Sequence, residues 1–141
     1  LLELAYGTWV NDTYWLLMPY KLRDPGVQLV YEGRETIEGR TYDKLALSFE
    51  KVGLTPGDHY WVYVDAETHL VGRWAYLLEG SGDGQAPTAW TWEGWKSYGG
   101  IQLAPMRRMV GGDRTLELTD LRVDRELPDA AFTSPAPIAW P

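Results

Sequence analysis

The 141-residue sequence contains no cysteine and only two histidines, His59 and His69. Without cysteine there can be no disulfides, thiolate metal sites or cysteine nucleophiles. Two histidines leave little material for a catalytic triad, and their spacing matches no metal-binding motif. The sequence also lacks a Gly-x-Ser-x-Gly elbow, a phosphate-binding glycine loop and a His-Glu-x-x-His helix. It therefore predicts no catalytic residue, no metal and no cofactor.

Positive charge is scarce as well. The chain has 13 Lys and Arg residues and 20 Asp and Glu residues, which gives a net charge of -7. Nucleic-acid binding relies on clustered basic side chains that release counterions from phosphates, and here basic pairs such as Arg107 and Arg108 are isolated. We therefore expect no nucleic-acid partner. No apolar run approaches the roughly 20 residues that a membrane-spanning helix requires.

Aromatic residues that carry a polar atom are abundant. The chain has eight Trp and nine Tyr but only two Phe. Indole and phenol rings favour positions with one apolar and one wet side, so this composition is typical of a half-buried surface or a binding face.

Short β-rich runs separated by turn residues recur along the whole chain, without a sustained helical period. Links such as Asn11-Asp12, Gly99-Gly100 and Gly111 to Asp113 are typical of hairpin turns and favour antiparallel neighbours. The sequence predicts one all-β meander with little or no helix. The expected strands are Leu2 to Val10, Thr13 to Met18, Val27 to Glu32, Arg40 to Glu50, His59 to Val64, Leu70 to Leu78, Thr88 to Tyr98, Ile101 to Val110 and Thr115 to Val123.

Two segments are expected to lie outside regular strands. Gly80 to Pro87 is predicted to be a flexible loop tip, and a Ca²⁺ site there is disfavoured because Asp83 is its only carboxylate. The tail, residues 128–141, carries four of the nine prolines and is predicted to be extended, with Phe132 anchoring it in the core.

Several expected strands are apolar on both sides. Trp61 and Tyr63 alternate with Tyr60, Val62 and Val64, and the run from Leu70 to Leu78 behaves likewise. Such strands need cover on both faces, from a curled sheet, segments outside the chain, a partner or a ligand. The predicted ligand-binding residues are Trp15, Trp61, Tyr63, Trp74, Tyr76, Trp90, Trp92 and Trp95.

Glu93, between Trp92 and Trp95, is the strongest single candidate for a carboxyl group with a raised pKa. Glu117 and Asp120 are the next, and for each of them an ordinary surface charge is the favoured interpretation. A hydrolase that uses Glu93 with a histidine remains an alternative, although the sequence favours a protein without catalytic activity.

Four segments together resemble an uncharacterised family of exported bacterial proteins with a lipoprotein-carrier (LolA/LolB-like) fold. They are Asn11 to Val27, with its Met-Pro and Asp-Pro-Gly-Val elements, Tyr60 to Thr68, Tyr98 to Pro105 and Leu127 to Pro135. The resemblance implies a strongly curved antiparallel half-barrel with an apolar concave face. It also implies a periplasmic or lipid-anchored location at the cell envelope. The chain is then expected to be one domain from the carboxy-terminal portion of a larger exported protein.

The leading functional hypothesis is non-catalytic binding of an apolar molecule, such as a lipid or the acyl chain of a lipoprotein, on the aromatic residues. One alternative is a carbohydrate-binding module that uses the rings as a sugar platform. Another is a structural domain whose apolar face docks a partner or forms a homodimer. Association with a membrane surface is compatible with the leading hypothesis.

Overall fold

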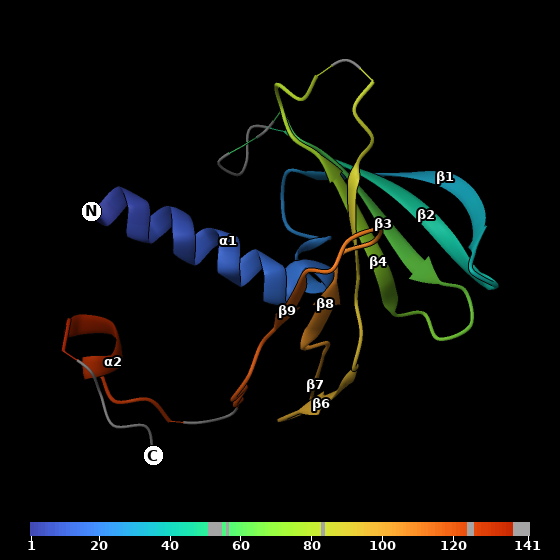
Figure 1. The fold of residues 1–141 in the computed structure, drawn as a ribbon. Coiled ribbons are helices and arrows are strands. Elements are labelled where there is room, and N and C mark those ends of the chain that lie inside the picture. The colour runs from blue at the N-terminus through green and yellow to red at the C-terminus, as the bar shows by residue number, and fades with distance from the viewer. Residues whose placement is uncertain (51–54, 56, 83, 124–125, 137–141) are drawn as a thin grey trace.

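The structure is a computed structural model that describes residues 1–50, 55, 57–82, 84–123 and 126–136. Its centre is a five-stranded antiparallel sheet in which the strands follow one another in chain order (Figure 1). The strands are β1 (Val27–Ile37), β2 (Arg40–Phe49), β3 (His59–Asp65), β4 (Val71–Leu77) and β5 (Thr88–Thr91). The predicted antiparallel meander is therefore confirmed, while the strongly curved half-barrel is not.

Two small hairpins follow the sheet. Strand β6 (Lys96–Tyr98) pairs with β7 (Ile101–Leu103), and β8 (Met106–Arg108) pairs with β9 (Thr115–Glu117). The expected strands Thr88 to Tyr98 and Ile101 to Val110 are thus each divided in two. Bridges from Trp90 to Met109 and from Glu93 to Met106 join this region to the end of the sheet.

The first 21 residues differ from the strands predicted for them and form a helix. Helix α1 (Leu2–Lys21) replaces the two strands expected at Leu2 to Val10 and Thr13 to Met18, and the expected hairpin at Asn11-Asp12 lies inside it. Leu, Glu, Ala, Met and Lys are good helix formers, and β-branched residues are few here. None of the helices in the described part of the chain has the length and apolarity to span a membrane.

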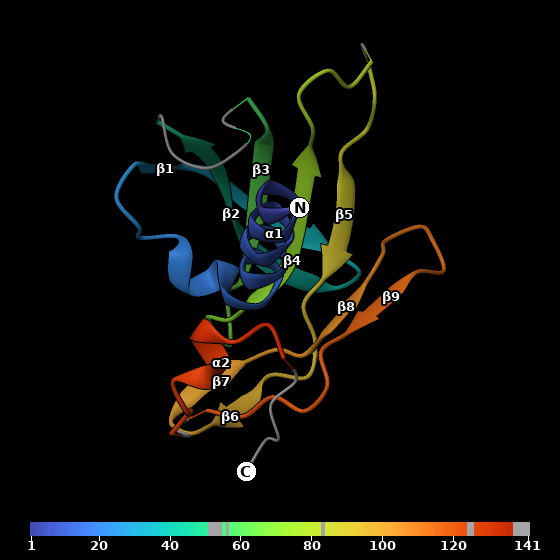
Figure 2. The ribbon, with the colours of Figure 1, turned by 90° about the vertical axis from the view of Figure 1, so that its left-hand side faces the viewer.

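Helix α1 stands on one face of the sheet rather than lying along it. Figure 1 shows its carboxy-terminal turns against the sheet and its amino-terminal turns projecting away. In Figure 2 the helix is seen nearly end-on in front of β2 to β4. Burial agrees with this arrangement, because Met18 is fully buried whereas Leu4 and Trp9 are 72% and 64% exposed.

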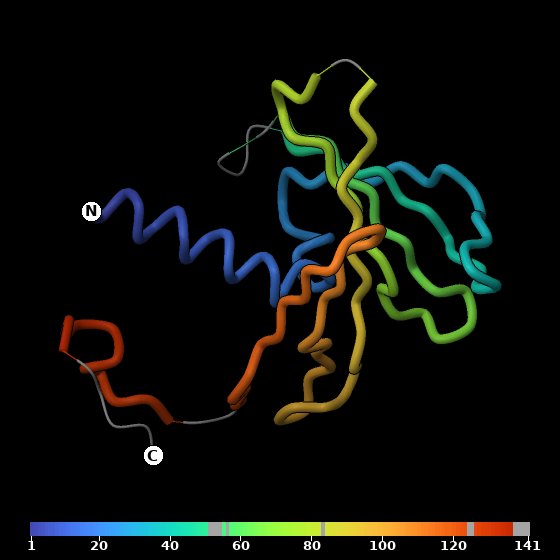
Figure 3. Tube along the Cα trace, viewed as in Figure 1, coloured from blue at the N-terminus to red at the C-terminus, as the bar shows by residue number. Residues whose placement is uncertain are grey.

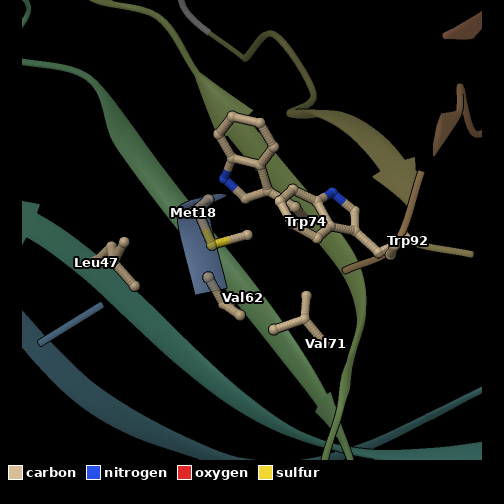
Figure 4. Packing of buried hydrophobic residues seen from close by; sticks show 7 residues of the cluster. Met18, Leu47, Val62, Val71, Trp74 and Trp92 are labelled. Carbon is tan, nitrogen blue, oxygen red and sulfur yellow. The ribbon is translucent and has the colours of Figure 1, made fainter. Parts of the chain in front are cut away.

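The hydrophobic core forms where the base of α1 meets the sheet. Met18 from the helix packs with Leu47, Val62, Val71 and Trp74 from three neighbouring strands (Figure 4). Residues four apart in a helix share a face, so Tyr14, Met18 and Leu22 all pack against this cluster. Burial of these side chains holds an otherwise weakly amphipathic helix in place.

The end of the chain differs from its prediction. Residues 130–133 form a short helix, α2 (Ala130–Thr133), so the tail is not extended throughout. Phe132 is 78% exposed and does not anchor the tail in the core. The trace in Figure 3 shows this segment apart from the sheet. Asp83, the carboxylate weighed for Ca²⁺ binding, lies outside the described residues.

Candidate functional site

The two faces of the five-stranded sheet have different side chains. The inner face, which α1 contacts, presents Leu47, Phe49, Tyr60, Val62, Trp74, Tyr76 and Trp90. The outer face presents Tyr42, Lys44, Ala46, Trp61, Tyr63, Arg73, Ala75 and Ala89. Paired residues in neighbouring strands point to the same side, so the register assigns each residue to a face.

Trp74 is the centre of an aromatic cluster on the inner face. Its ring stacks on Tyr60 with centroids 5.6 Å apart and an interplanar angle of 16°. Trp15 from α1 meets the edge of the same ring at 4.8 Å and also contacts Trp90 at 5.3 Å. Edge and offset contacts of this kind are favourable geometries for aromatic pairs. The cluster therefore joins the base of α1 to β3, β4 and β5.

Polar atoms inside this cluster are incompletely paired. Within the described residues, the buried Nε1 atoms of Trp74, Trp90 and Trp92 have no hydrogen-bond acceptor. Trp95, in contrast, donates its Nε1–H to the carbonyl oxygen of Val71 at 2.8 Å. A buried N–H group without an acceptor costs free energy. A ligand that brought an acceptor to these three indoles would therefore remove this cost.

Arg107 is fully buried at the base of α1. Its guanidinium lies 3.5 Å from the ring centroid of Trp92 and donates to the carbonyl oxygens of Ala104, Met106 and Trp15. Burial lowers the pKa of Arg107 to about 9. The group therefore stays cationic at neutral pH, stabilised by the ring face and by carbonyl dipoles.

A proline in the helix explains the hydrogen bond that Arg107 donates to α1. Pro19 lies four residues after Trp15 and has no backbone N–H, so the Trp15 carbonyl lacks its usual helical donor. The Nη2 of Arg107 donates to that carbonyl at 2.7 Å. A second connection lies nearby, where the Tyr20 hydroxyl donates to the Gln102 carbonyl at 2.8 Å and accepts from the Gln102 N–H at 3.0 Å.

Half-buried rings surround the corner where α1 rises from the inner face. Tyr14 contacts Phe49 and Tyr60, and Tyr60 contacts Tyr76. Burial raises the pKa of the Tyr14 hydroxyl above its ordinary value. Burial, with the hydrogen bond donated to Asp58, raises the pKa of Tyr60 to about 12. These phenols therefore remain neutral, and the corner has an apolar lining.

The projecting half of α1 carries a second group of apolar residues, which is exposed to solvent. Leu1, Leu2, Leu4, Tyr6 and Trp9 are all exposed. A shallow hollow lies along them, lined by Leu1, Leu4, Ala5, Thr8, Trp9, Asp12 and Thr13. Tyr6 and Trp9 contact each other with ring centroids 6.3 Å apart. Exposed apolar side chains gathered on one element are typical of a surface that contacts something apolar.

The structure separates the eight predicted ligand-binding residues into two groups. Trp61 and Tyr63 lie on the outer face, where they pack with Tyr42 and Ala75. The other six lie on the inner side: Trp15, Trp74, Tyr76, Trp90, Trp92 and Trp95. The eight rings do not line one concavity. Trp61 and Tyr63, two residues apart in β3, share the outer face, whereas α1 contacts the inner face.

The candidate catalytic and metal-binding groups are not brought together. Hydrogen bonds from Thr91 and Arg108 lower the pKa of Glu93, which reverses the raised value expected from its aromatic neighbours. His59 begins β3 and His69 lies in the β3–β4 turn, and both are exposed. The described residues contain no group of His, Asp and Glu side chains able to hold a metal ion.

Sequence reasoning missed the role of α1 and of Arg107. The recurrence of Tyr14, Met18 and Leu22 at intervals of four is a helical signal, but Gly7, Asn11 and Pro19 interrupt it. In the sequence, Arg107 is one of an isolated basic pair with Arg108, and this pattern does not indicate a buried role. The signal that could have found it is Pro19, since a proline within a helix leaves a carbonyl that needs a donor.

No known protein family matches the sequence, and neither does any curated protein. Among solved structures, the fold is similar to that of a LolA superfamily protein from Nitrosomonas europaea. The TM-score is 0.56 and the sequence identity is 15%. The match covers 79% of this chain and 50% of the other, so the chain corresponds to about half of that protein. The likeness confirms the predicted LolA-like architecture of a mostly antiparallel β protein.

Proposed function

We propose that this protein binds an apolar, acyl-type ligand without catalysing a reaction, in the corner between α1 and the inner face. The observation that carries the proposal is that α1 carries two apolar surfaces: at its base Tyr14 packs beside the half-buried ring of Tyr60, and further along the helix Leu4 and Trp9 are exposed. A methylene chain that lay along these surfaces would cover side chains that are otherwise exposed to water.

The energetics favour an acyl chain over a small polar ligand. Each buried methylene group contributes about 0.8 kcal/mol, so a chain gains affinity with its length along such a surface. Tyr14 and Tyr60 are neutral phenols whose raised pKa values reflect a poorly hydrated setting. The unpaired Nε1 atoms of Trp74 and Trp90 are donors for an ester or amide oxygen that reached the inner layer.

The fold supports a setting at the cell envelope. A LolA-like architecture and the resemblance of Asn11 to Val27 to exported bacterial proteins both favour a periplasmic or lipid-anchored protein. The ligand is then a free lipid or the acyl chain of a lipoprotein. A partner protein that docks on α1, including a second copy of the chain, is the competing interpretation of the same exposed residues.

Palmitate titration tests the proposal. We expect a saturable change in tryptophan emission, measured below the concentration at which palmitate aggregates. Trp9→Ala should weaken binding about tenfold, because it removes a large exposed ring from the proposed surface. Tyr31→Ala removes an exposed ring from β1 and should leave the affinity unchanged.

Two results would count against acyl binding. One is an absence of any saturable change in the unmodified protein. The other is equal affinity in all three proteins, which would place the ligand elsewhere. A dimer that dissociates on Trp9→Ala, together with no palmitate binding, would favour the docking interpretation.

A further inference from the structure

The outer face has a regular arrangement of small and large side chains. The strand register places Ala46, Trp61, Ala75 and Ala89 in one row across β2, β3, β4 and β5. The adjacent row on the same face is Lys44, Tyr63, Arg73 and Thr91. One large ring flanked by methyl groups therefore lies next to a row of polar groups.

The alanine row leaves a hollow beside Trp61. Its volume is about 420 Å³, and Ala75, Ala89 and Pro87 line it together with Trp61 and Tyr63. This volume lies within the range of roughly 300–1,000 Å³ that is usual for small-molecule sites. Trp61 is half-buried, so its ring forms an apolar wall that a flat ligand can contact.

The two cations of the polar row are in different electrostatic states. Lys44 is neutralised by Glu32 at 3.1 Å and Glu35 at 3.9 Å. Arg73 lies over the ring of Tyr63, with its guanidinium carbon 5.9 Å from the centroid. Among the described residues, no carboxylate forms an ion pair with Arg73. Its donors are therefore able to bind an anion.

We propose that the outer face holds a second binding site, for a pyranose sugar that carries a carboxylate. The apolar C–H face of the sugar stacks on Trp61 above Ala75 and Ala89. The carboxylate pairs with Arg73, whose planar guanidinium suits two-point recognition of such a group. Glu32 and Lys44, which also line the hollow, supply acceptors and donors for the hydroxyl groups.

Charge and polarity distinguish this site from the acyl corner. The outer site mixes ionised side chains with the half-buried aromatic wall of Trp61, which suits a ligand with one apolar face and polar edges. The inner corner has neutral rings and no ion pair among its described lining residues. The sites lie on opposite faces, so either proposal can fail without the other.

Calorimetric titration with trigalacturonate tests the site, with its fully methyl-esterified form as a neutral ligand of the same shape. We expect trigalacturonate to bind about tenfold or more tightly than the ester, because the ester loses the charge-assisted bonds to Arg73. Arg73→Gln should abolish this preference and Arg73→Lys should keep part of it. Arg114→Gln, in the β8–β9 turn, is the control and should behave as the unmodified protein.

Three results would overturn the proposal: no binding of either sugar, equal affinity for acid and ester, or an unchanged preference in Arg73→Gln. Trp61→Phe keeps an apolar ring and should weaken both sugars by a similar factor. Circular dichroism of each variant establishes that it is folded before its affinity is interpreted.

Discussion

The inner and outer faces of the same sheet accommodate apolar residues in different ways. On the inner face, large rings pack densely around Trp74 and are covered by the base of α1. On the outer face, alanines alternate with single rings, and the long side chains of Lys44 and Arg73 lie over Trp61 and Tyr63. The aliphatic stems of Lys and Arg can cover apolar surface while their charged groups stay in water. Strands that are apolar on both sides therefore need only one covering element.

The largest difference in the free energy of unfolding should appear between a tryptophan substitution on the inner face and one on the outer face. Trp74→Ala removes a ring that is 3% exposed and contacts five other rings, so it should lower the free energy of unfolding by about 3–5 kcal/mol. Trp61→Ala removes a half-buried ring and should cost markedly less. Urea denaturation of both variants measures this, and equal losses would contradict the assignment of the main core to the inner face.

Substitutions in the two halves of α1 should also differ in how much they lower the free energy of unfolding. Met18→Ala removes a fully buried side chain and should cost about 2–5 kcal/mol of unfolding free energy. Leu4→Ala lies on the projecting half and should change stability by no more than about 0.5 kcal/mol. Thermal unfolding of the pair is the measurement. A large loss in Leu4→Ala would show that the projecting half packs against the protein.

The bond between Arg107 and the Trp15 carbonyl should depend on Pro19. Pro19→Ala restores a helical donor to that carbonyl, so the loss on Arg107→Met should be smaller in the Pro19→Ala background. A double-mutant cycle should give a coupling free energy of about 0.5–3 kcal/mol. Additive effects would mean that Arg107 stabilises the fold through Ala104, Met106 and Trp92 alone.

The smallest expected effect is a change in stability at acidic pH that depends on the β3–β4 turn. Backbone N–H groups of Thr68 and Glu67 donate to Asp65 at 2.8 and 2.9 Å and lower the pKa of its carboxyl group. A lowered folded pKa means stability that is present above the unfolded value of about 3.9 and is lost as the pH falls through the folded pKa. Asp65→Asn should therefore be less stable at pH 7, and the difference should shrink below about pH 4.

The control for this pH dependence is Asp113→Asn, which changes an exposed carboxylate in the β8–β9 turn. Its stability should follow that of the unmodified protein across the acid range. A constant difference between Asp65→Asn and the unmodified protein down to pH 2, or an identical loss in Asp113→Asn, would contradict the role assigned to the turn.

Sequence reasoning succeeded where the local signals agreed. The strands from Arg40, His59 and Thr88 begin at the predicted residues, because alternation and turn residues both mark those starts. It failed at the amino terminus, where α1 takes the place of the expected strands Leu2 to Val10 and Thr13 to Met18 and of the expected turn at Asn11-Asp12. There the tertiary contacts of Tyr14, Trp15 and Met18 with the sheet decide the structure.

The candidate site was predictable only in its residue types. The abundance of Trp and Tyr indicated binding surfaces, but alternation alone did not show that Trp61 and Trp74 lie on opposite faces. Their assignment depends on the pairing of Trp61 with Ala75 and of Val62 with Trp74, a register set by the β3–β4 turn and by the bulge between Tyr63 and Val64. These are long-range features that a period of two cannot specify.

Nuclear magnetic resonance of the indole N–H groups would decide where an acyl ligand binds. The eight tryptophans give separate signals that substitution can assign. On addition of palmitate we expect the signals of Trp9, Trp15, Trp74 and Trp90 to shift together while that of Trp61 stays in place. A shift confined to Trp61, or none at all, would contradict binding between α1 and the inner face.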